Sequence, residues 1–330
     1  MTVTKPKYYD TFRCLADRCP DSCCHQWAVV VDEASQARYQ ALDSALGQDL
    51  RAVMVEDEGE IILALRPDGR CPMWRDDGLC RIQAELGEDA LCETCHQFPR
   101  LRHDYGNFVE LGLELSCPEA ARLILSSDSE TITKSLPGGQ TPDYDTQAMA
   151  ILQESRNQAL ALLSNSDYTV TEALAILLLY AYAVQEHLDG GLEAVLQPAQ
   201  DLAAARSLPL SPTGNILDFC KELNILTPRW RDRLSRPLGG SWTDSYRALA
   251  KYFVDRYWLQ AISDDDLLGR VKLLLFSCLV IRTLGGDLCQ TAQLYSKEIE
   301  NDAENIDTIL DAAYTHPALS DSNLLYLLLS

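Results

Sequence analysis

A length of 330 residues, with 47% hydrophobic and 23% charged residues, excludes a disordered, fibrous or collagen-like chain and allows one large or two ordinary domains. The 49 acidic residues outnumber the 28 basic ones, which gives a formal net charge of −21. Since such a surface repels phosphate backbones and anionic lipid, we expect no nucleic acid and no membrane as partner and favour a basic or lysine-bearing protein.

The N-terminal residues 1–12 lack the apolar run of a secretory signal, so we expect a cytoplasmic protein. The longest apolar stretches, Ala173–Val184 and Leu273–Ile281, are too short to span a bilayer and are predicted to form buried helices. Because the cytosol keeps thiols reduced, the twelve cysteines are not expected to form disulfides.

Nine of the twelve cysteines lie at or before residue 117, at short spacings that indicate a metal site. One group is Cys14-x4-Cys19-x3-Cys23-Cys24, and a second is Cys71-x8-Cys80 followed by Cys95. The spacings match neither paired C-x2-C zinc knuckles nor a ferredoxin run nor the C-x3-C-x2-C motif of radical enzymes, and they leave the metal open. Three further cysteines stand in apolar sequence and are predicted to be small buried side chains: Cys220, Cys278 and Cys289.

Few regular elements are predicted among the cysteines. Asp32 is expected to cap a single helix whose apolar positions recur every three or four residues from Tyr39 to Val53. Glu60–Leu65 is predicted to be a strand, and the alternation over residues 109–115 indicates another with one wet face. We expect these two strands to form a small antiparallel pair, with the cysteines on the surrounding loops.

Cys117 stands in the sequence Ser116-Cys117-Pro118-Glu119, which is predicted to form a capping box with proline in the first turn of a helix. This arrangement places the Cys117 sulfur at a helix N-terminus, where the dipole favours the thiolate that binds metal.

Ordered blocks of residues in the first 125 positions form a recognisable pattern. The blocks are Phe12-x-Cys14, Cys19, Cys23-Cys24 with Trp27 and Asp32 behind it, Cys71-Pro72, Gly78-Leu79-Cys80-x-Ile82, Gly87-Glu88, Thr94-Cys95, Phe98-Pro99-Arg100 and Leu115-Ser116-Cys117-Pro118-Glu119-Ala120-Ala121. This pattern resembles the flagellin lysine N-methylases, which belong to a broader set of cysteine-rich bacterial proteins regarded as zinc- or iron-chelating.

The resemblance implies transfer of methyl groups from S-adenosylmethionine to lysine side chains of flagellin, by a protein that carries a 4Fe–4S cluster, with zinc as the alternative metal. Carried over to this sequence, the metal-site residues are Cys14, Cys19, Cys23, Cys24, Cys71, Cys80, Cys95 and Cys117. Cys92 is a departure from the family pattern and is not expected in the set. Eight thiolates allow two sets of four, or one cluster with additional structural cysteines.

Residues 126–142 are polar and broken by Pro and Gly-Gly, which predicts a linker between a cysteine-rich domain (1–125) and a helical domain (143–330). Thr169-x-x-Glu172 is a predicted capping box of a helix that stops near Gly190-Gly191. Further helices are expected at 192–206, 215–226, 243–262, 265–284, 288–304 and 319–328. The predicted fold is mainly α: a small metal-binding domain with a short antiparallel β pair, followed by an irregular all-α domain.

No catalytic or donor-binding residue can be assigned from the sequence, because the glycine-rich turn of a Rossmann-type donor site is missing. Four residues near the cysteines are candidates to receive a cation, although packing and capping are the favoured roles: Tyr8, Tyr9, Trp27 and Asp32. Arg100 is expected to form a structural salt bridge, and His25 and His96 are alternative ligands. The competing interpretation is a non-catalytic zinc or iron–sulfur protein whose helical domain binds a protein partner.

Overall fold

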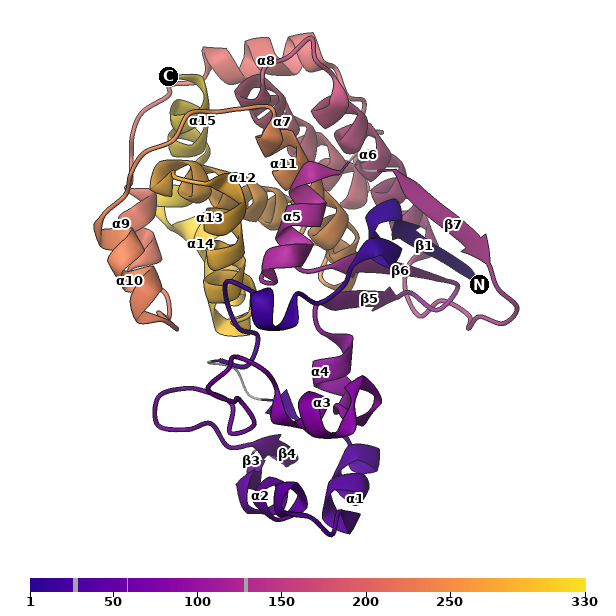
Figure 1. Cartoon of the computed structure of the whole chain (residues 1–330). Coiled ribbons are helices and arrows are strands. Elements are labelled where there is room, and N and C mark those ends of the chain that lie inside the picture. The colour runs from indigo at the N-terminus through magenta and orange to yellow at the C-terminus, as the bar shows by residue number, and fades with distance from the viewer. Residues whose placement is uncertain (26–28, 58, 128–129) are drawn as a thin grey trace.

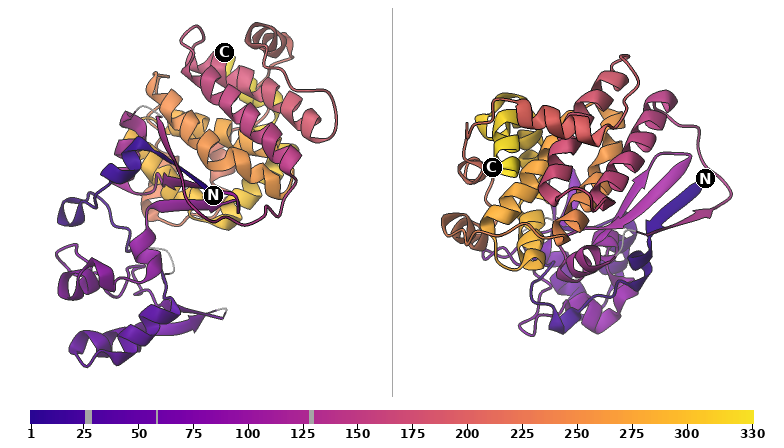
Figure 2. Two further views of the ribbon diagram at one scale, coloured as in Figure 1. Left: turned by 90° about the vertical axis from the view of Figure 1, so that its right-hand side faces the viewer. Right: turned by 90° about the horizontal axis from the view of Figure 1, so that it is seen from above.

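The computed structural model describes residues 1–25, 29–57, 59–127 and 130–330. Figures 1 and 2 show a small unit that extends from a larger helical body. Each has its own hydrophobic core: buried residues between 29 and 92 form one, and Phe12 joins residues from 113 onward in the other. The two cores therefore do not follow the domain boundary expected at residue 125. The residues on both sides of the cysteine-rich segment pack on the helical body instead.

The small unit contains a three-stranded antiparallel sheet in the order β2-β4-β3. Short helices surround it and carry most of its apolar contacts. Its strands are β2 (Val29–Val30), β3 (Met54–Asp57) and β4 (Glu60–Leu63), and its helices are α1 (Glu33–Ala41), α2 (Ala45–Val53), α3 (Arg81–Leu86), the 3-10 helix Glu88–Ala90 and α4 (Glu93–Gln97).

The single helix predicted to follow Asp32 is in fact two helices. Asp32 caps α1 as expected, since its carboxylate accepts a hydrogen bond from the Ser35 N–H. The chain then breaks, because the Ser44 hydroxyl caps α2 by accepting from the Gly47 N–H at 3.2 Å. Gly47 is required there, as a Cβ would lie 2.2 Å from the Leu42 carbonyl oxygen.

A second, four-stranded sheet lies against the helical body in the order β5-β6-β1-β7 (Figure 1). Its strands are β1 (Thr2–Pro6), β5 (Arg100–Asp104), β6 (Phe108–Leu113) and β7 (Thr131–Ser135). β1 runs parallel to β6 and antiparallel to β7, and β5 is antiparallel to β6.

Two predictions about this part of the chain differ from the observed structure. The strands predicted at 60–65 and 109–115 exist as β4 and β6, but they lie in different sheets and do not pair. The segment 126–142, predicted as a linker, contains β7, whose Ile132 faces Lys5 of β1. Its polar residues suit an edge strand that is exposed on most of its length.

The helical body confirms a mainly α fold. The predicted buried stretches form α7 and α12, and α12 is buried along nearly its whole length. No described helix is long and apolar enough to cross a bilayer. The helices are α5 (Pro118–Ser126), α6 (Thr146–Ser164), α7 (Val170–Leu188), α8 (Pro198–Ser207), α9 (Ile216–Cys220), α10 (Pro228–Ser235), α11 (Ser245–Tyr257), α12 (Leu267–Leu284), α13 (Leu288–Tyr295), α14 (Ala303–Thr315) and α15 (Asp321–Leu329).

Several helix boundaries depart from the sequence pattern. The helix expected at 192–206 begins only at Pro198, since proline suits the first helical turn. The single helix expected at 288–304 is divided in the structure. Its first part is α13, which is followed by a π-helical turn, Ser296–Glu300, and α14 begins after that turn. That turn buries Glu298 and Glu300, which a regular amphipathic pattern does not predict.

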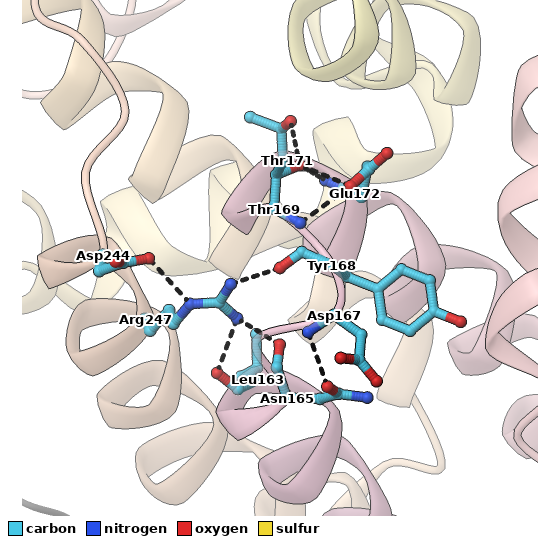
Figure 3. Close-up of polar contacts among 9 residues, drawn as sticks. All are labelled: Leu163, Asn165, Asp167, Tyr168, Thr169, Thr171, Glu172, Asp244 and Arg247. Carbon is cyan, nitrogen blue, oxygen red and sulfur yellow. Dashed lines mark hydrogen bonds and ion pairs between the residues drawn. The ribbon is translucent and has the colours of Figure 1, made fainter.

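A side chain of a third helix, α11, holds the turn between α6 and α7 (Figure 3). Thr169 and Glu172 form the predicted capping box at the start of α7. The Arg247 guanidinium of α11 donates to the carbonyl oxygens of Leu163 and Asn165 at 3.1 Å each, and to that of Tyr168. One side chain therefore satisfies acceptors at the end of α6 and in the turn.

Arg247→Met keeps most of the aliphatic stem and removes the donors to these carbonyl groups. We expect a loss of about 1–3 kcal/mol in the free energy of unfolding, measured by urea denaturation. Arg229→Met, at an exposed position of α10, is the matched control and should change stability little. Equal stability of the two variants would contradict a fixing role for Arg247.

Candidate functional site

Five cysteines line the core of the small unit: Cys24, Cys71, Cys80, Cys92 and Cys95. Backbone contacts between loops bring their segments together. The Cys71 N–H donates a hydrogen bond to the Cys24 carbonyl oxygen at 2.8 Å, and Cys80 forms an isolated antiparallel β-bridge with Trp74. Cys80 and Cys92 stand at the N-caps of α3 and α4. Two of the five cysteines therefore stand where short helices begin.

The thiols of this group and the neighbouring Cys23 thiol shift the pKa values of one another. The hydrogen bond with Cys24 lowers the pKa of Cys23 to about 7 and also lowers the pKa of Cys71. The hydrogen bond with Cys95 lowers the pKa of Cys92 to about 7. Conversely, the same bonds raise the pKa of Cys24 and Cys95. Cys24 and Cys95 therefore keep their protons and favour the thiolate of their neighbours.

A second group lies where the small unit meets the body: Cys14, Cys19, Cys23 and Cys117. Burial raises the pKa of Cys19, with smaller contributions from the charges of Cys14 and Cys23. Burial likewise raises the pKa of Cys117 to about 12, and the charges of Cys19 and Cys23 add to this shift. Cys23 interacts with both groups and adjoins Cys24, so the two groups meet at the Cys23-Cys24 pair.

The capping box predicted at Ser116–Glu119 does not form. Cys117 is the N-cap of α5, with Pro118 in the first turn. The Ser116 hydroxyl instead donates to Glu114 at 2.7 Å, and Glu119 pairs with Arg122. Backbone N–H groups of Ala120 and Glu119 do stabilise the Cys117 thiolate, as expected for a helix N-terminus, but burial outweighs them and the pKa rises.

All eight predicted ligand cysteines thus belong to one of two neighbouring groups, and Cys92 joins them. No three histidine, cysteine, aspartate or glutamate side chains in the described ranges close tightly enough to hold a metal ion, and no disulfide joins cysteines there. The metal set therefore stays a prediction. The family pattern does not include Cys92, although its C-x2-C spacing with Cys95 is a common metal-knuckle signal.

The other cysteines and candidates have more ordinary surroundings. Cys220 and Cys278 are buried in the body as predicted, whereas Cys289 is half-buried. Asp32 has a second structural role, accepting from the Glu93 N–H at 2.8 Å. Trp27 lies outside the described residues.

Among the remaining candidates, Tyr9 has the Lys5 ammonium 5.6 Å from its ring centroid. The Arg100 guanidinium lies over the Phe12 ring at 5.3 Å rather than in the predicted salt bridge. His25 packs edge-on against Trp74, and His96 lies in α4. These contacts are those of packing residues.

Side chains of α13 and of its π-helical extension hold the cysteine loops against the body. The Lys297 ammonium pairs with the Asp21 carboxylate at 3.0 Å and donates to the Ser22 carbonyl. The Gln293 amide donates to Asp21 at 2.9 Å and to the Ser116 carbonyl at 2.8 Å. One helix face therefore positions both the Cys23-Cys24 loop and the Cys117 loop.

A cavity of about 530 Å³ lies between β1, β5 and β6 of the larger sheet and helices α6 and α11. Its apolar wall includes Leu101, Leu113 and Leu160. The polar lining is formed by Lys5, Tyr8, His103, Glu110, Arg156, Tyr252, Asp255 and Arg256. Threonine, asparagine and glutamine side chains also line the cavity, so its wall is of mixed polarity, and its volume lies in the range of small-molecule sites.

Within the residues that the structure describes, some charged side chains around the cavity form ion pairs and one does not. Arg156 forms a two-pronged ion pair with Glu110 at 2.8 and 2.6 Å. Arg256 pairs with Glu300 at 3.0 Å, and Lys5 pairs with Asp10 at 2.6 Å. The Asp255 carboxylate is reached from the cavity and has no bonded cation among the described residues.

Two titratable groups of the cavity wall have shifted pKa values. The surrounding protein raises the pKa of Asp255 to about 6, and the charges of Arg156 and Lys251 offset part of this effect. Burial lowers the pKa of His103, so its imidazole is neutral near pH 7. The buried His103 Nε2 has no hydrogen-bond partner in the described chain. Perturbed groups of this kind, gathered in one cavity, are typical of functional sites.

A buried network connects the cavity wall to the helix face that holds the cysteine loops. The hydroxyl groups of Tyr252 and Tyr257 donate to Glu300 at 3.0 and 2.9 Å. Glu300 belongs to the same π-helical turn as Lys297. The cavity and the cysteine groups are thus joined through one rigid element.

Comparisons with known proteins identify three relatives of this chain. It is 37% identical over 133 residues to the flagellar biosynthetic protein FliU of Salmonella muenchen, an alignment that covers 38% of this chain and 78% of that protein. It is also 36% and 38% identical, each over 133 residues, to the lysine-N-methylases of Salmonella typhimurium and Salmonella choleraesuis.

These alignments cover 38% of this chain and about a third, 33%, of each lysine-N-methylase. No family model and no solved structure matches the chain. The protein belongs to the flagellin lysine methylase family, in agreement with the resemblance of the cysteine blocks.

Lys297→Met tests the contact between the cysteine loops and the body. The substitution leaves the mostly buried Asp21 carboxylate without its cation, so we expect a loss of about 1–3 kcal/mol in the free energy of unfolding. Trypsin should also cleave faster after the exposed Arg18. Lys221→Met, which removes an exposed pair with Asp218, is the control. Unchanged cleavage and stability would show that Lys297 does not hold the loop.

Proposed function

We propose that this protein is a protein-lysine N-methyltransferase that transfers methyl groups from S-adenosylmethionine to lysine side chains of flagellin. The observation that carries the proposal is the likeness to proteins named lysine-N-methylase and to a flagellar biosynthetic protein. The net charge of −21 supports it, since an acidic surface attracts a lysine-bearing partner.

The reaction sets requirements that the chain's own residues must meet. The carbon–sulfur bond of the sulfonium breaks with its electron pair left on sulfur, while the lysine nitrogen supplies the pair of the new carbon–nitrogen bond. The ammonium must therefore lose a proton and lie in line with the methyl group. A cavity lined by apolar, aromatic and charged side chains, as described above, is a place where such positioning can be achieved.

We further propose that the clustered cysteines bind an iron–sulfur centre. The donor set fits, because thiolates are the usual ligands of such clusters and several of these thiols favour deprotonation. The ligands would come from Cys14, Cys19, Cys23 and Cys117 on one side, and from Cys24, Cys71, Cys80, Cys92 and Cys95 on the other. When bound, the centre supplies bonds that tie together loops with little shared apolar surface.

Cys92→Ser tests the residue that the structure adds to the predicted ligand set. We expect protein purified without oxygen to lose iron and acid-labile sulfide relative to wild type, because serine is a poor ligand for a soft metal centre. Cys289→Ser, which changes a half-buried cysteine of the body, should keep the wild-type content. Full iron in the Cys92 variant would remove it from the ligand set, and zinc in place of iron in wild type would refute the iron–sulfur assignment.

The activity is tested by incubating purified flagellin with metal-loaded protein and S-adenosylmethionine. Mass spectrometry of the digested flagellin should find added methyl groups on lysine residues. Reactions without donor and with heat-denatured protein are the controls. Flagellin that binds the loaded protein but gains no methyl group would contradict the proposal and favour a non-catalytic metal protein.

A further inference from the structure

We propose that the cavity between the larger sheet and helices α6 and α11 binds a positively charged alkyl group, with the Asp255 carboxylate as its counter-ion. The inference rests on the proposed function, which supplies two such groups: the sulfonium of the methyl donor and the ammonium of the substrate lysine. Both combine a single positive charge with attached methylene groups, so they share the chemistry that the cavity would recognise.

The charge balance of the cavity wall supports a cationic ligand. Each cation that lines the cavity already has its own carboxylate: Lys5 has Asp10, Arg156 has Glu110 and Arg256 has Glu300. His103 adds no charge, since burial keeps it neutral. Of the two carboxylates that line the cavity, Glu110 is paired and Asp255 has no ion-pair partner among the described residues, although the charges of Arg156 and Lys251 act on it.

Arg156 is the cation whose charge acts most strongly on Asp255, but its guanidinium forms its ion pair with another carboxylate. Both terminal nitrogens of the guanidinium donate to Glu110, at 2.8 and 2.6 Å, so the side chain is held in that direction. Asp255 is exposed and keeps its carboxylate accessible on the cavity wall. A cation that enters the cavity therefore meets a carboxylate that no described residue already pairs with.

The remaining surface of the cavity suits the uncharged part of such a ligand. Leu101, Leu113 and Leu160 offer apolar contacts for a methylene chain or a heterocycle. Tyr8 and Tyr252 add aromatic rings, whose faces attract cations. The Tyr8 phenol is close enough to Asp255 to sense its charge. The unpartnered Nε2 of His103 offers a further hydrogen-bonding atom on the same cavity.

Asp255→Asn tests the inference, since asparagine has nearly the same shape without the charge. Asp311→Asn, at an exposed carboxylate of α14, is the matched control. Calorimetry on metal-loaded full-length protein uses two ligand pairs that differ in one charge. The first is S-adenosylmethionine with its neutral thioether product S-adenosylhomocysteine, and the second is a flagellin peptide containing lysine with the same peptide containing norleucine.

The expected result is that Asp255→Asn weakens binding of the cationic member of one pair by about tenfold to a hundredfold, while its neutral partner binds as it does to wild type. Loss with S-adenosylmethionine assigns the cavity to the donor, and loss with the lysine peptide assigns it to the substrate. Wild-type affinity of the variant for both cations would overturn the inference, as would failure of both cations to bind the wild-type protein.

Leu160→Trp provides a second variant, which fills the cavity without changing its charge. It should weaken the same cation and also the neutral partner, and unchanged binding of both would count against the cavity. Melting temperature and iron content establish that each variant is folded.

The methylation assay keeps the two proposals separate. Methyl transfer with unchanged KM for both substrates in Asp255→Asn would refute the cavity and leave the activity. Asp255-dependent cation binding by a wild-type protein that methylates no flagellin would refute the activity and leave the cavity.

Discussion

The arrangement depends on one mostly buried polar contact, in which Lys297 and Gln293 hold Asp21 and the Ser116 carbonyl. The small unit shares little apolar core with the body, since the two hydrophobic cores are separate. A directional contact is therefore what fixes the loops that carry Cys23, Cys24 and Cys117. Its partners are far apart in the sequence, so it forms only when the sheet and the helices are both in place.

The cysteines illustrate how neighbouring thiols divide their protons. Cys24 and Cys95 hold theirs and make their neighbours more acidic, whereas burial keeps Cys117 protonated despite its place at a helix N-terminus. Metal binding by such a set requires the release of protons, so affinity would rise with pH until the thiols are ionised. The two groups meet at the Cys23-Cys24 pair.

The cavity follows a different principle, in which each cation of the lining has a carboxylate of its own and Asp255 has no ion-pair partner in the described part of the chain. The ion pairs of Arg156 and Arg256 also fix the walls, because they join the sheet to α6 and α11 to the π-helical turn. That turn carries Glu300 towards the cavity network and Lys297 towards the cysteine loops. The two places are thus connected through a single element.

Local sequence chemistry determined the caps at Asp32 and Thr169, the strand at β6, the buried helices α7 and α12 and the concentration of thiols in the first third of the chain. These features depend on residues within one or two turns of each other, where side-chain period and capping groups decide the conformation. Only the tertiary structure decided that β1 pairs with β6 and β7, that Ser44 interrupts a helix, that Cys92 joins the other cysteines and that Asp255 lacks a cation. Strand partners, burial and charge compensation are set by contacts between distant segments, and a one-dimensional pattern does not contain them.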